Sequence, residues 1–353
     1  MLPNNIAGQV PQCLVTVGDT LLKSSDFMME SVDIHLSAGS QSNSCNVTVL
    51  CGYDYKNGKL TGDAASTLAA GKKVTVKLGY SSPKEVFIGY INSVSTEFSS
   101  EGAVISFSCL DARGMLMGNN SHKSYENKSV KQIIEGLFNS VKSYTGGTEV
   151  SVSAEADKEN PLTQHDMDDY SYICTLAKLT GSSFCMTGTK LRFVDNIFNS
   201  ASVQETYTWG KDLLSFNRTV ELAEQLGEVT VSGSSPDSEE EFSVTVKPKS
   251  GSKKTGDKLS SGVKSRKKKI ISSMIRSQKE AKAFAESLMS ESSMKLCSGS
   301  ATVLGNQELT PGGKITFERL DPSVSGTYYI TSVNHRFGSG GFMTVIGFCS
   351  DGV

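Results

Sequence analysis

Histidines and the acids near them are the first residues of this chain that could do chemistry. The four histidines are widely separated, and only His165 has carboxylates beside it, in the segment QHDMDDYSY. Imidazole and carboxylate groups together can ligate a divalent metal. However, Asp166, Asp168 and Asp169 directly precede a helix expected from Tyr170, where the helix dipole stabilises acidic side chains. We therefore interpret this segment as a helix start and predict no metal site.

Other patterns of catalytic residues are also missing from the sequence. There is no HExxH, GxSxG, phosphate-binding loop or dinucleotide-binding glycine pattern. Glu97 and Glu101 do not make a convincing acid–base pair, because nothing apolar is placed to raise the pKa of one carboxyl. His335 lies in a strand with alternating residues and is expected to face solvent. We predict that the chain is not an enzyme and that it holds no cofactor.

Composition sets further limits. The chain has 353 residues, a net charge of −2 and 37% hydrophobic residues, which is enough for two or three domains. It shows no secretory signal and no apolar run of about 18 residues that could span a membrane. The eight cysteines include no CxxC pair, which is typical of free thiols in a reducing cytoplasm. A bridge such as Cys45 to Cys51 remains the alternative.

The segment from Lys247 to Lys269 is strongly basic. It contains ten Lys or Arg residues and one acid, Asp257. One interpretation is an arm that contacts the acidic surface of a partner; the other is a solvated hairpin tip or linker. Nucleic acid is an unlikely partner because no aromatic residue is interleaved to stack on bases. The candidate partner-contact residues are Lys247, Lys249, Lys253, Lys254, Lys264, Arg266, Lys267, Lys268 and Lys269.

A nine-residue phrase occurs twice, as YINSVSTEF from Tyr90 and as YITSVNHRF from Tyr329. Related runs precede the copies (LAAGKKVTV and LTPGGKITF) and follow them (EGAVISFSCLD and GGFMTVIGFCSD), with residue numbers that differ by 239 to 241. Dense β-branched and aromatic residues with turn residues between them predict three strands per copy. We predict a duplicated antiparallel β module, in which the equivalent positions are Gly71 and Gly312, Tyr90 and Tyr329, and Cys109 and Cys349.

The fold class predicted from these patterns is α+β, mostly β, with two duplicated tube-like antiparallel β-barrels and a small α+β domain between them. The expected boundaries are 1–112 for the first barrel, 113–204 for the α+β insert, and 205–353 for the second barrel with a Lys-rich loop at 247–269. Ser129 with Gln132 predicts a capped helix, and Gly181 predicts the end of another. A hairpin turning at Gly188 and a helix capped by Ser277 complete the prediction.

The run QHDMDDYSYICTLAKLTGSSFCMTGTKLRFVD resembles the corresponding run of the phage late-control gene D proteins and of the hub part of VgrG spike proteins. The Ser277-capped helix, LTPGGKITF, GTYYITSVNHRF and GFMTVIGF are similar to the final barrel of that family. Weaker versions of the pattern cover FIGYINSVSTEF and SYENKSVKQIIEGLF. Four motifs in the family's order make the resemblance specific from about residue 60 onward.

The resemblance implies a structural baseplate hub that joins a hexameric tail tube to a trimeric spike in a contractile phage tail or related injection system. Two similar barrels per chain in a homotrimer would present six tube-like faces. The implied partners are a tail tube protein, a separate spike protein, and baseplate wedge or other baseplate proteins. We expect synthesis in a bacterial cytoplasm and incorporation into an assembled particle. The alternatives are a tail-tip cell-wall hydrolase and a carbohydrate-binding or adhesin-like β protein.

Overall fold

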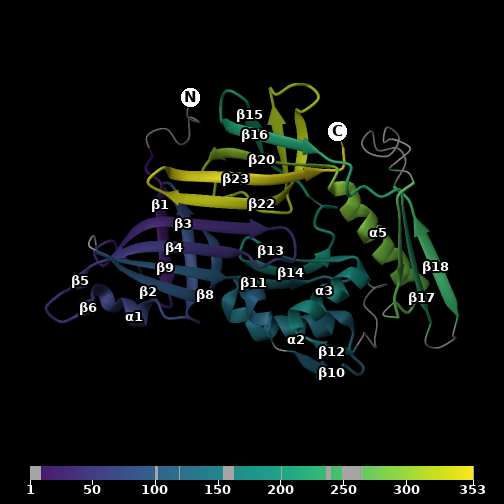
Figure 1. Cartoon of the computed structure of the whole chain (residues 1–353), viewed down its shortest axis with the longest axis horizontal. Helices are drawn as coiled ribbons and strands as arrows, with labels where there is room; N and C mark the ends of the chain where they lie inside the picture. Colours follow the sequence, from purple (N-terminus) through teal and green to yellow (C-terminus); the bar gives the residue numbers. More distant parts are fainter. Residues whose placement is uncertain are drawn as a thin grey trace.

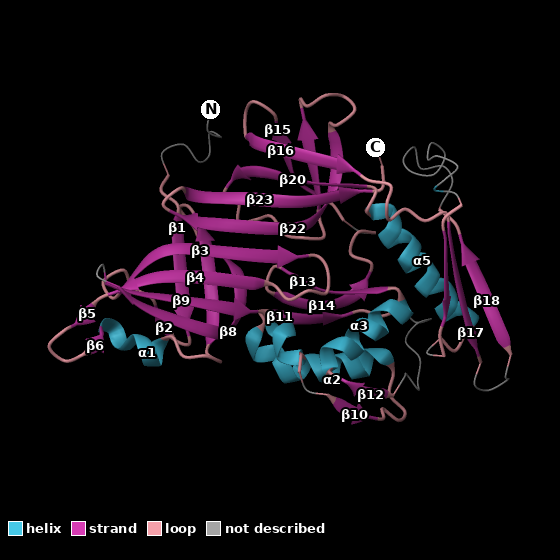
Figure 2. Cartoon of the chain, in the orientation of Figure 1, coloured by secondary structure: helices cyan, strands magenta, loops and turns pink. Residues whose placement is uncertain are grey.

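The computed structural model describes residues 9–99, 102–118, 120–153, 163–199, 201–235, 240–248, 263, 265–273 and 275–352. Strands dominate; the helices labelled α2, α3 and α5 lie toward one side of the molecule, and the short α1 lies at the other (Figures 1 and 2). In the described residues no helix is long and apolar enough to span a membrane.

The first part of the chain is almost entirely strands. Its elements are β1 (Gln12–Val17), β2 (Thr20–Leu21), β3 (Phe27–Ser37), β4 (Ser44–Cys51), β5 (Tyr53–Asp54), β6 (Lys59–Leu60), the 3-10 helix η1 (Thr61–Asp63), α1 (Ala64–Thr67), β7 (Lys73–Gly79), β8 (Lys84–Ser99) and β9 (Gly102–Leu110). In β4 and β9, buried and less buried residues alternate, because successive side chains of a strand point to opposite faces.

The middle of the chain holds the long helices α2 and α3. Its elements are η2 (Ala112–Leu116), β10 (Ser121–Lys123), α2 (Val130–Val141), η3 (Lys142–Tyr144), β11 (Gly147–Val150), β12 (Gln164–Met167), α3 (Asp169–Thr180), β13 (Ser182–Thr187) and β14 (Lys190–Asp195). The predicted capping box of Ser129 and Gln132 is confirmed. Gly181 ends α3 in a left-handed conformation, and Gly188 turns the β13–β14 hairpin, as predicted.

The last part returns to strands. Its elements are β15 (Val203–Thr208), β16 (Leu213–Val220), β17 (Glu228–Ser234), β18 (Glu241–Val246), β19 (Lys267–Ile271), α5 (Gln278–Met294), β20 (Cys297–Leu304), β21 (Lys314–Glu318), β22 (Gly326–Gly338) and β23 (Gly341–Ser350). Ser277 caps α5 as predicted, its side chain accepting a hydrogen bond from the backbone N–H of Glu280.

One large curled sheet runs through both ends of the chain. Its strand order is β16-β20-β23-β22-β3-β4-β9-β8-β7-β1-β2, and β21 pairs with both β22 and β15. The pairing of β22 with β3 joins the late strands to the early ones (Figure 1), and one apolar core contains residues from both. The architecture is thus mostly β, as predicted. Among the described residues, strands from both ends of the chain form one continuous sheet of 13 strands, in which β15 joins β21 in parallel.

Two smaller cores lie beside the large sheet. Helices α2 and α3 pack on the β13–β14 hairpin around buried residues that include Ile134, Tyr172 and Phe193. Helix α5 packs on the sheet β18-β17-β19 around Val229, Val231 and other residues. This second unit belongs to the region 205–353, for which the sequence predicted a barrel, a Lys-rich loop and the helix capped by Ser277, but no separate sheet beneath that helix. The structure therefore adds a helix-and-sheet unit at the side of the large sheet (Figure 2).

The expectation that His335 faces solvent is wrong. Its side chain is fully buried, as is that of Val333. The pairing of β22 with β23 shifts register between Ile330 and Ser332, which indicates a bulge. Because one extra residue moves the following side chains to the opposite face, the inward positions change from Tyr328 and Ile330 to Val333 and His335.

The eight cysteines are free, as predicted. The alternative bridge between Cys45 and Cys51 is wrong, because both residues lie on the single strand β4. Six residues of strand separate them by about 20 Å, whereas a disulfide needs Cα atoms within about 7 Å.

Candidate assembly interface

Among the described residues, a similar spatial order of six strands occurs at each end of the large sheet. In the first set the spatial order is β3-β4-β9-β8-β7-β1, and in the second it is β16-β20-β23-β22-β21-β15. When the strands of each set are ranked by their place in the chain, the two spatial orders are the same. Five of the six strands also match in direction, whereas β1 is antiparallel to β7 and β15 is parallel to β21. The repeated strand order thus extends beyond the three strands that the sequence repeat marks, and we call each set a module.

Irregular features recur at matching places in the two sets. The β8–β9 pairing shifts register between Ile91 and Ser93, as the β22–β23 pairing does between Ile330 and Ser332. Turn glycines recur as well. The N–H of Gly71 donates to the carbonyl of Ile91 over 2.8 Å, and that of Gly312 donates to the carbonyl of Ile330 over 2.9 Å. Both glycines have positive φ, 84° and 90°, a conformation that favours glycine.

The strand register relates the two cysteines differently from the sequence alignment. Tyr90 lies opposite Leu110, whereas Tyr329 lies opposite Cys349. By this pairing, the position of Cys349 is matched by Leu110, and Cys109 is its immediate neighbour. The reason is that backbone hydrogen bonds, and not the shared Cys-x-Asp letters, set equivalent positions in a sheet. Superposition of the whole modules remains a prediction.

Within the chain, the two modules meet along one stretch of paired backbone, which we call the seam: Val32–Ser37 of β3 with Ser332–Phe337 of β22, antiparallel. Val333 and His335 are buried there, and Arg336 lies 3.7 Å from Asp33 across the strands. In the seam, β3 of the first module covers the C-terminal half of β22, which belongs to the second module.

Among the described residues, no strand covers the matching half of β8 in this way. From Asn92 to Ser99 every residue is exposed, and over this stretch β8 is paired along one side, to β9. Val94 and Phe98 match the buried Val333 and the partly buried Phe337, yet they are 39% and 61% exposed. We call Ser93–Phe98 the β8 edge.

Strand β16 occupies the position of β3 in the second module. In the described residues β20 is the only named strand that pairs with it, and its first residue, Leu213, also forms an isolated bridge with Trp209. Strand β16 carries exposed apolar side chains, including Leu214, which is 47% exposed, and Val220, which is 45% exposed. We call Phe216–Glu221 the β16 edge. The described residues therefore expose two strand edges. The β8 edge has no neighbouring strand that corresponds to β3, and the β16 edge has no neighbouring strand that corresponds to β22.

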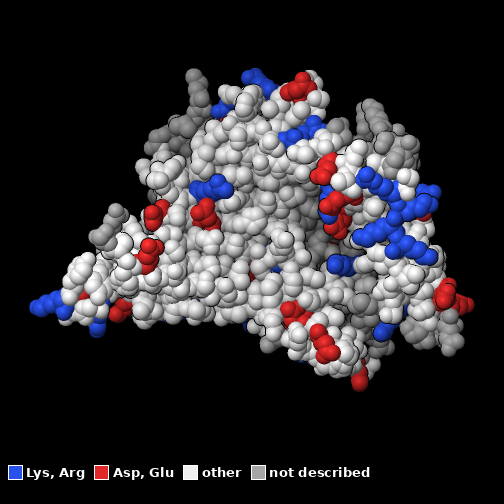
Figure 3. Space-filling model, viewed as in Figure 1, with Lys and Arg blue, Asp and Glu red and all other residues white. Residues whose placement is uncertain are grey.

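The described part of the Lys-rich segment lies in the unit of β17, β18 and β19. Lys267, Lys268 and Lys269 form the exposed edge strand β19. Lys267 pairs with Glu228 over 3.1 Å, and Arg266 donates to the carbonyl oxygens of Leu222 and Ala223. Figure 3 shows Lys and Arg gathered over this side of the molecule. Lys249, Lys253, Lys254 and Lys264 lie outside the described residues, and Lys247 also pairs with Glu228, over 3.8 Å.

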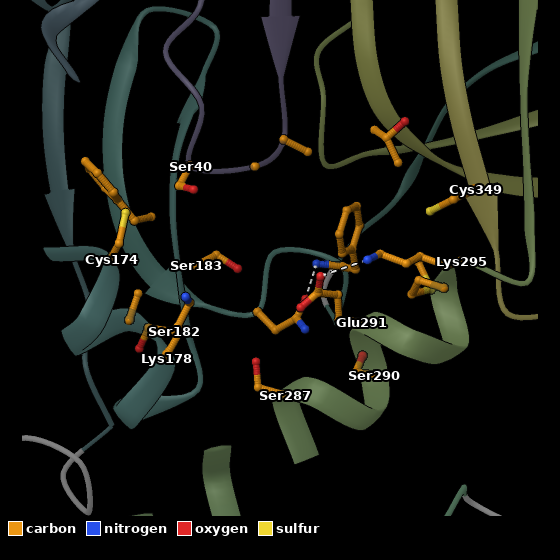
Figure 4. A pocket seen from close by; sticks show the side chains of 18 of the residues that line it. Ser40, Cys174, Lys178, Ser182, Ser183, Ser287, Ser290, Glu291, Lys295 and Cys349 are labelled. Atoms are coloured by element: carbon orange, nitrogen blue, oxygen red, sulfur yellow. Dashed lines mark hydrogen bonds and ion pairs between the residues drawn. The ribbon is translucent and has the colours of Figure 1, made fainter. Parts of the chain in front are cut away.

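A cavity of about 490 Å³ lies between the insert, α5 and the large sheet. Figure 4 shows its serines with Lys178, Lys295 and Glu291, the last two joined by an ion pair of 3.2 Å. Its two thiols are not activated. Burial raises the pKa of Cys174 and raises that of Cys349 to about 12, so both remain protonated and poorly nucleophilic at neutral pH.

Asp168 caps α3 and Asp169 lies in its first turn, as predicted, whereas the prediction is wrong for Asp166, which lies in a cluster with His122 and His165. The Asp168 carboxylate accepts a hydrogen bond of 2.7 Å from the N–H of Ser171, and that of Asp169 accepts one from Lys123. His165 and Asp166 lie apart from this cap and meet His122 instead. No sequence pattern points to His122, because it lies 43 residues before His165, on the separate strand β10.

A family model described as the Alg8 N-terminal domain matches residues 9–338. The chain belongs to this family. No curated protein matches it. Among solved structures, a 43 kDa tail protein of prophage MuSo2 from Shewanella oneidensis has a TM-score of 0.72 and 13% identity, covering 96% of this chain and 98% of its own. A tail protein from Neisseria meningitidis has a TM-score of 0.70 and 13% identity, covering 97% of each chain.

The fold of this Alg8 N-terminal domain family member is also similar to an Escherichia coli component of the type VI secretion system, described as similar to the T4 bacteriophage tail proteins gp27 and gp5. That likeness has a TM-score of 0.62 and 12% identity, covering 95% of this chain and 76% of the other. The chain therefore has the fold of phage tail and secretion-spike proteins, which is the coarser part of the resemblance found in its sequence.

Proposed function

We propose that this Alg8 N-terminal domain family member is a structural, non-catalytic hub of a contractile tail or injection system. In this proposal three copies form a ring in which the β8 edge of one copy pairs with the β16 edge of the next. One observation carries the proposal. The β8 edge corresponds to the part of β22 that pairs with β3 in the seam, and the β16 edge corresponds to the part of β3 that pairs with β22, yet each of these edges is exposed along one side in the described residues.

The seam predicts the register of this contact. Val94 corresponds to Val333 and Phe98 to Phe337, through the shared bulge of β8 and β22. In the other strand, Val32 corresponds to Phe216, because both β3 and β16 have a register shift just before it. In the seam, Phe337 lies opposite Val32, and Val333 lies opposite Leu36. If the contact between copies has the same register, Phe98 lies opposite Phe216, and Val94 lies opposite Val220.

This contact would cover side chains that are costly to leave in water. Full burial of a Val or Phe side chain contributes about 1.5 to 3 kcal/mol, and Val94, Phe98 and Val220 are between 39% and 61% exposed. Each would therefore contribute about 1 kcal/mol. Pairing would also satisfy edge backbone groups, which otherwise template aggregation. Six paired residues make a small contact, so we expect the ring to be strengthened by a partner.

The contact joins two different surfaces, so it is heterologous and forms a closed ring when the rotation permits. Two modules per chain and the resemblance to hub proteins support three copies, which would present six similar modules to a hexameric tail tube. The same resemblance supports a trimeric spike as a separate partner, further baseplate proteins as neighbours, and a place in an assembled particle. The protonated thiols of the cavity argue against a cysteine nucleophile there, which is one form of the hydrolase alternative.

The basic side of the β17–β19 unit supports an electrostatic contact within the assembly. Lys268 and Lys269 lie on the exposed edge strand β19, and the chain as a whole has a net charge of −2. We propose that this side contacts the acidic surface of a neighbouring subunit or of the tube or spike protein. Such binding should weaken as salt rises, because salt screens exposed charges.

The register can be tested by cross-linking the full chain, with and without its neighbouring tube and spike proteins. The double variant Val94→Cys with Val220→Cys should form disulfide-linked trimers under mild oxidation. A matched control, Val94→Cys with Thr219→Cys, places the second thiol on the other face of β16 and should link poorly. The single variants show the contribution of the native thiols.

The stoichiometry can be tested by mass measurement of the complex. Val94→Lys with Phe98→Lys should convert trimer to monomer without unfolding, because both side chains are exposed. Asn46→Lys adds a charge on the exposed face of the interior strand β4 and should leave the trimer intact. Six chains per particle end, or one, would show that the proposal is wrong.

A further inference from the structure

His122 and His165 face each other at the outer end of the insert. They come from β10 and β12, which pair antiparallel, and their ring centroids are 4.5 Å apart. Asp166 completes the cluster, with its Oδ2 atom 3.1 Å from Nδ1 of His165. One ligand atom of each residue lies within 4.8 Å of the others, and all three side chains are exposed.

An irregularity in the strand pairing brings these side chains together. Ser121 lies opposite Met167, and Lys123 lies opposite Gln164. His122, the single residue between the two pairs on β10, therefore faces both His165 and Asp166 on β12. Two residues opposite one is the arrangement of a β-bulge, which can redirect a side chain.

The backbone of Asp166 shows the same irregularity. Its φ is 48°, in the left-handed region that few residues other than glycine adopt. Consecutive residues of a regular strand point to opposite faces, so His165 and Asp166 could not share a ligand in an undistorted β12. The left-handed turn at Asp166 removes this restriction.

We propose that His122, His165 and Asp166 bind a divalent transition-metal ion such as Zn²⁺. Two imidazoles and a carboxylate are the ligand types that Zn²⁺ takes, and two ligands with bonds of about 2.0 Å lie about 3.3 Å apart on a tetrahedral ion. The 3.1 Å between His165 and Asp166 already has this spacing, and exposed side chains can rotate to close the rest. Three protein ligands leave a fourth position for water.

The chemistry of the ligands also defines which ions should bind. Imidazole nitrogen suits Zn²⁺, Ni²⁺ and Cu²⁺, whereas Mg²⁺ and Ca²⁺ prefer sites made of oxygen. The site should therefore take Zn²⁺ or Ni²⁺ in the presence of a large excess of Mg²⁺. The site lies on the insert and involves neither the β8 edge nor the β16 edge, so the inference does not depend on the proposed ring.

The test is isothermal titration of the full chain, without an affinity tag, with ZnCl₂ and separately with NiCl₂ in excess MgCl₂. One ion should bind per chain with a micromolar Kd. His122→Ala and His165→Ala should each weaken binding at least tenfold. Asp166→Asn tolerates the left-handed backbone and removes the charge, so it should weaken binding less. The matched control is His35→Ala, which removes an exposed histidine of β3.

Two results would overturn the proposal. The first is the lack of saturable binding below 1 mM for both ions. The second is binding that His122→Ala leaves unchanged, which would assign the ion to other groups such as thiols. Because all three ligands are exposed, the variants should keep the wild-type circular dichroism spectrum and melting temperature in the absence of metal.

Discussion

Acidification should weaken the seam between the two modules through His335. This imidazole lies within the paired backbone of β22 and β3. Its Nδ1 atom is 3.0 Å from the Thr344 hydroxyl, and Nε2 has no hydrogen-bond partner among the described residues. Burial lowers the pKa of His335 from 6.5 to about 4, because the low-dielectric interior disfavours the charged ring.

The sign and size of the effect follow from proton linkage. The unfolded chain binds a proton at His335 near pH 6.5, whereas the folded chain binds it only near pH 4, so stability falls as pH falls through this window. With the folded pKa at about 4, the loss from pH 7 to pH 5 is about 2 kcal/mol, and the full loss below pH 4 is about 3.4 kcal/mol.

Urea unfolding at pH 7, 6 and 5 measures this loss. Other groups also titrate over the range, so the informative quantity is the difference between the wild type and His335→Leu. The free energy of unfolding of the wild type should fall by about 2 kcal/mol more than that of the variant between pH 7 and pH 5. The matched control His35→Gln changes an exposed residue of β3 and leaves His335 in place, so it should behave as the wild type.

The reasoning is refuted if the wild type and His335→Leu lose the same free energy of unfolding between pH 7 and pH 5. That result would mean that His335 can be protonated within the folded seam, through local opening or water entry. A parallel cross-linking experiment at pH 5 would then show whether the seam remains closed.

Three further substitutions test the packing that supports the modules. Arg113→Met should cost about 3 to 5 kcal/mol, because it leaves the fully buried Asp111 carboxylate without the guanidinium that lies 2.8 Å away; a loss below 1 kcal/mol in urea unfolding would contradict this. Ser129→Ala should cost about 1 kcal/mol through loss of the α2 cap, and an unchanged melting temperature would argue against it. Gly299→Ala should destabilise β20 by about 1 to 3 kcal/mol, since its Cβ would lie 2.1 Å from a backbone oxygen. The control Gly136→Ala meets no atom within 4 Å and should stabilise α2 by up to about 1 kcal/mol; equal effects of the two alanines would rule out a steric cause.

Local sequence determined the features that depend on neighbouring residues. Ser129 with Gln132, Gly181 and Gly188 predicted a helix start, a helix end and a hairpin turn, and all three are present. Each depends on hydrogen bonds or on backbone conformation within about four residues, so the sequence contains the whole cause. The repeated phrase from Tyr90 and Tyr329 likewise predicted strands in matching positions, because similar residues favour the same strand pattern.

Tertiary structure decided what depends on register and on distant pairing. The burial of His335 follows from a single bulge, which changes the face of every later residue in its strand. The cluster of His122 with His165 and Asp166 needs two strands 43 residues apart and a second bulge between them. The exposed Val94 and the buried Val333 occupy matching places in similar strands, and they differ because β3 covers only one of them. Strand pairing depends on backbone groups that every residue has, so the choice of partner is set by the assembled sheet and not by the letters of either strand.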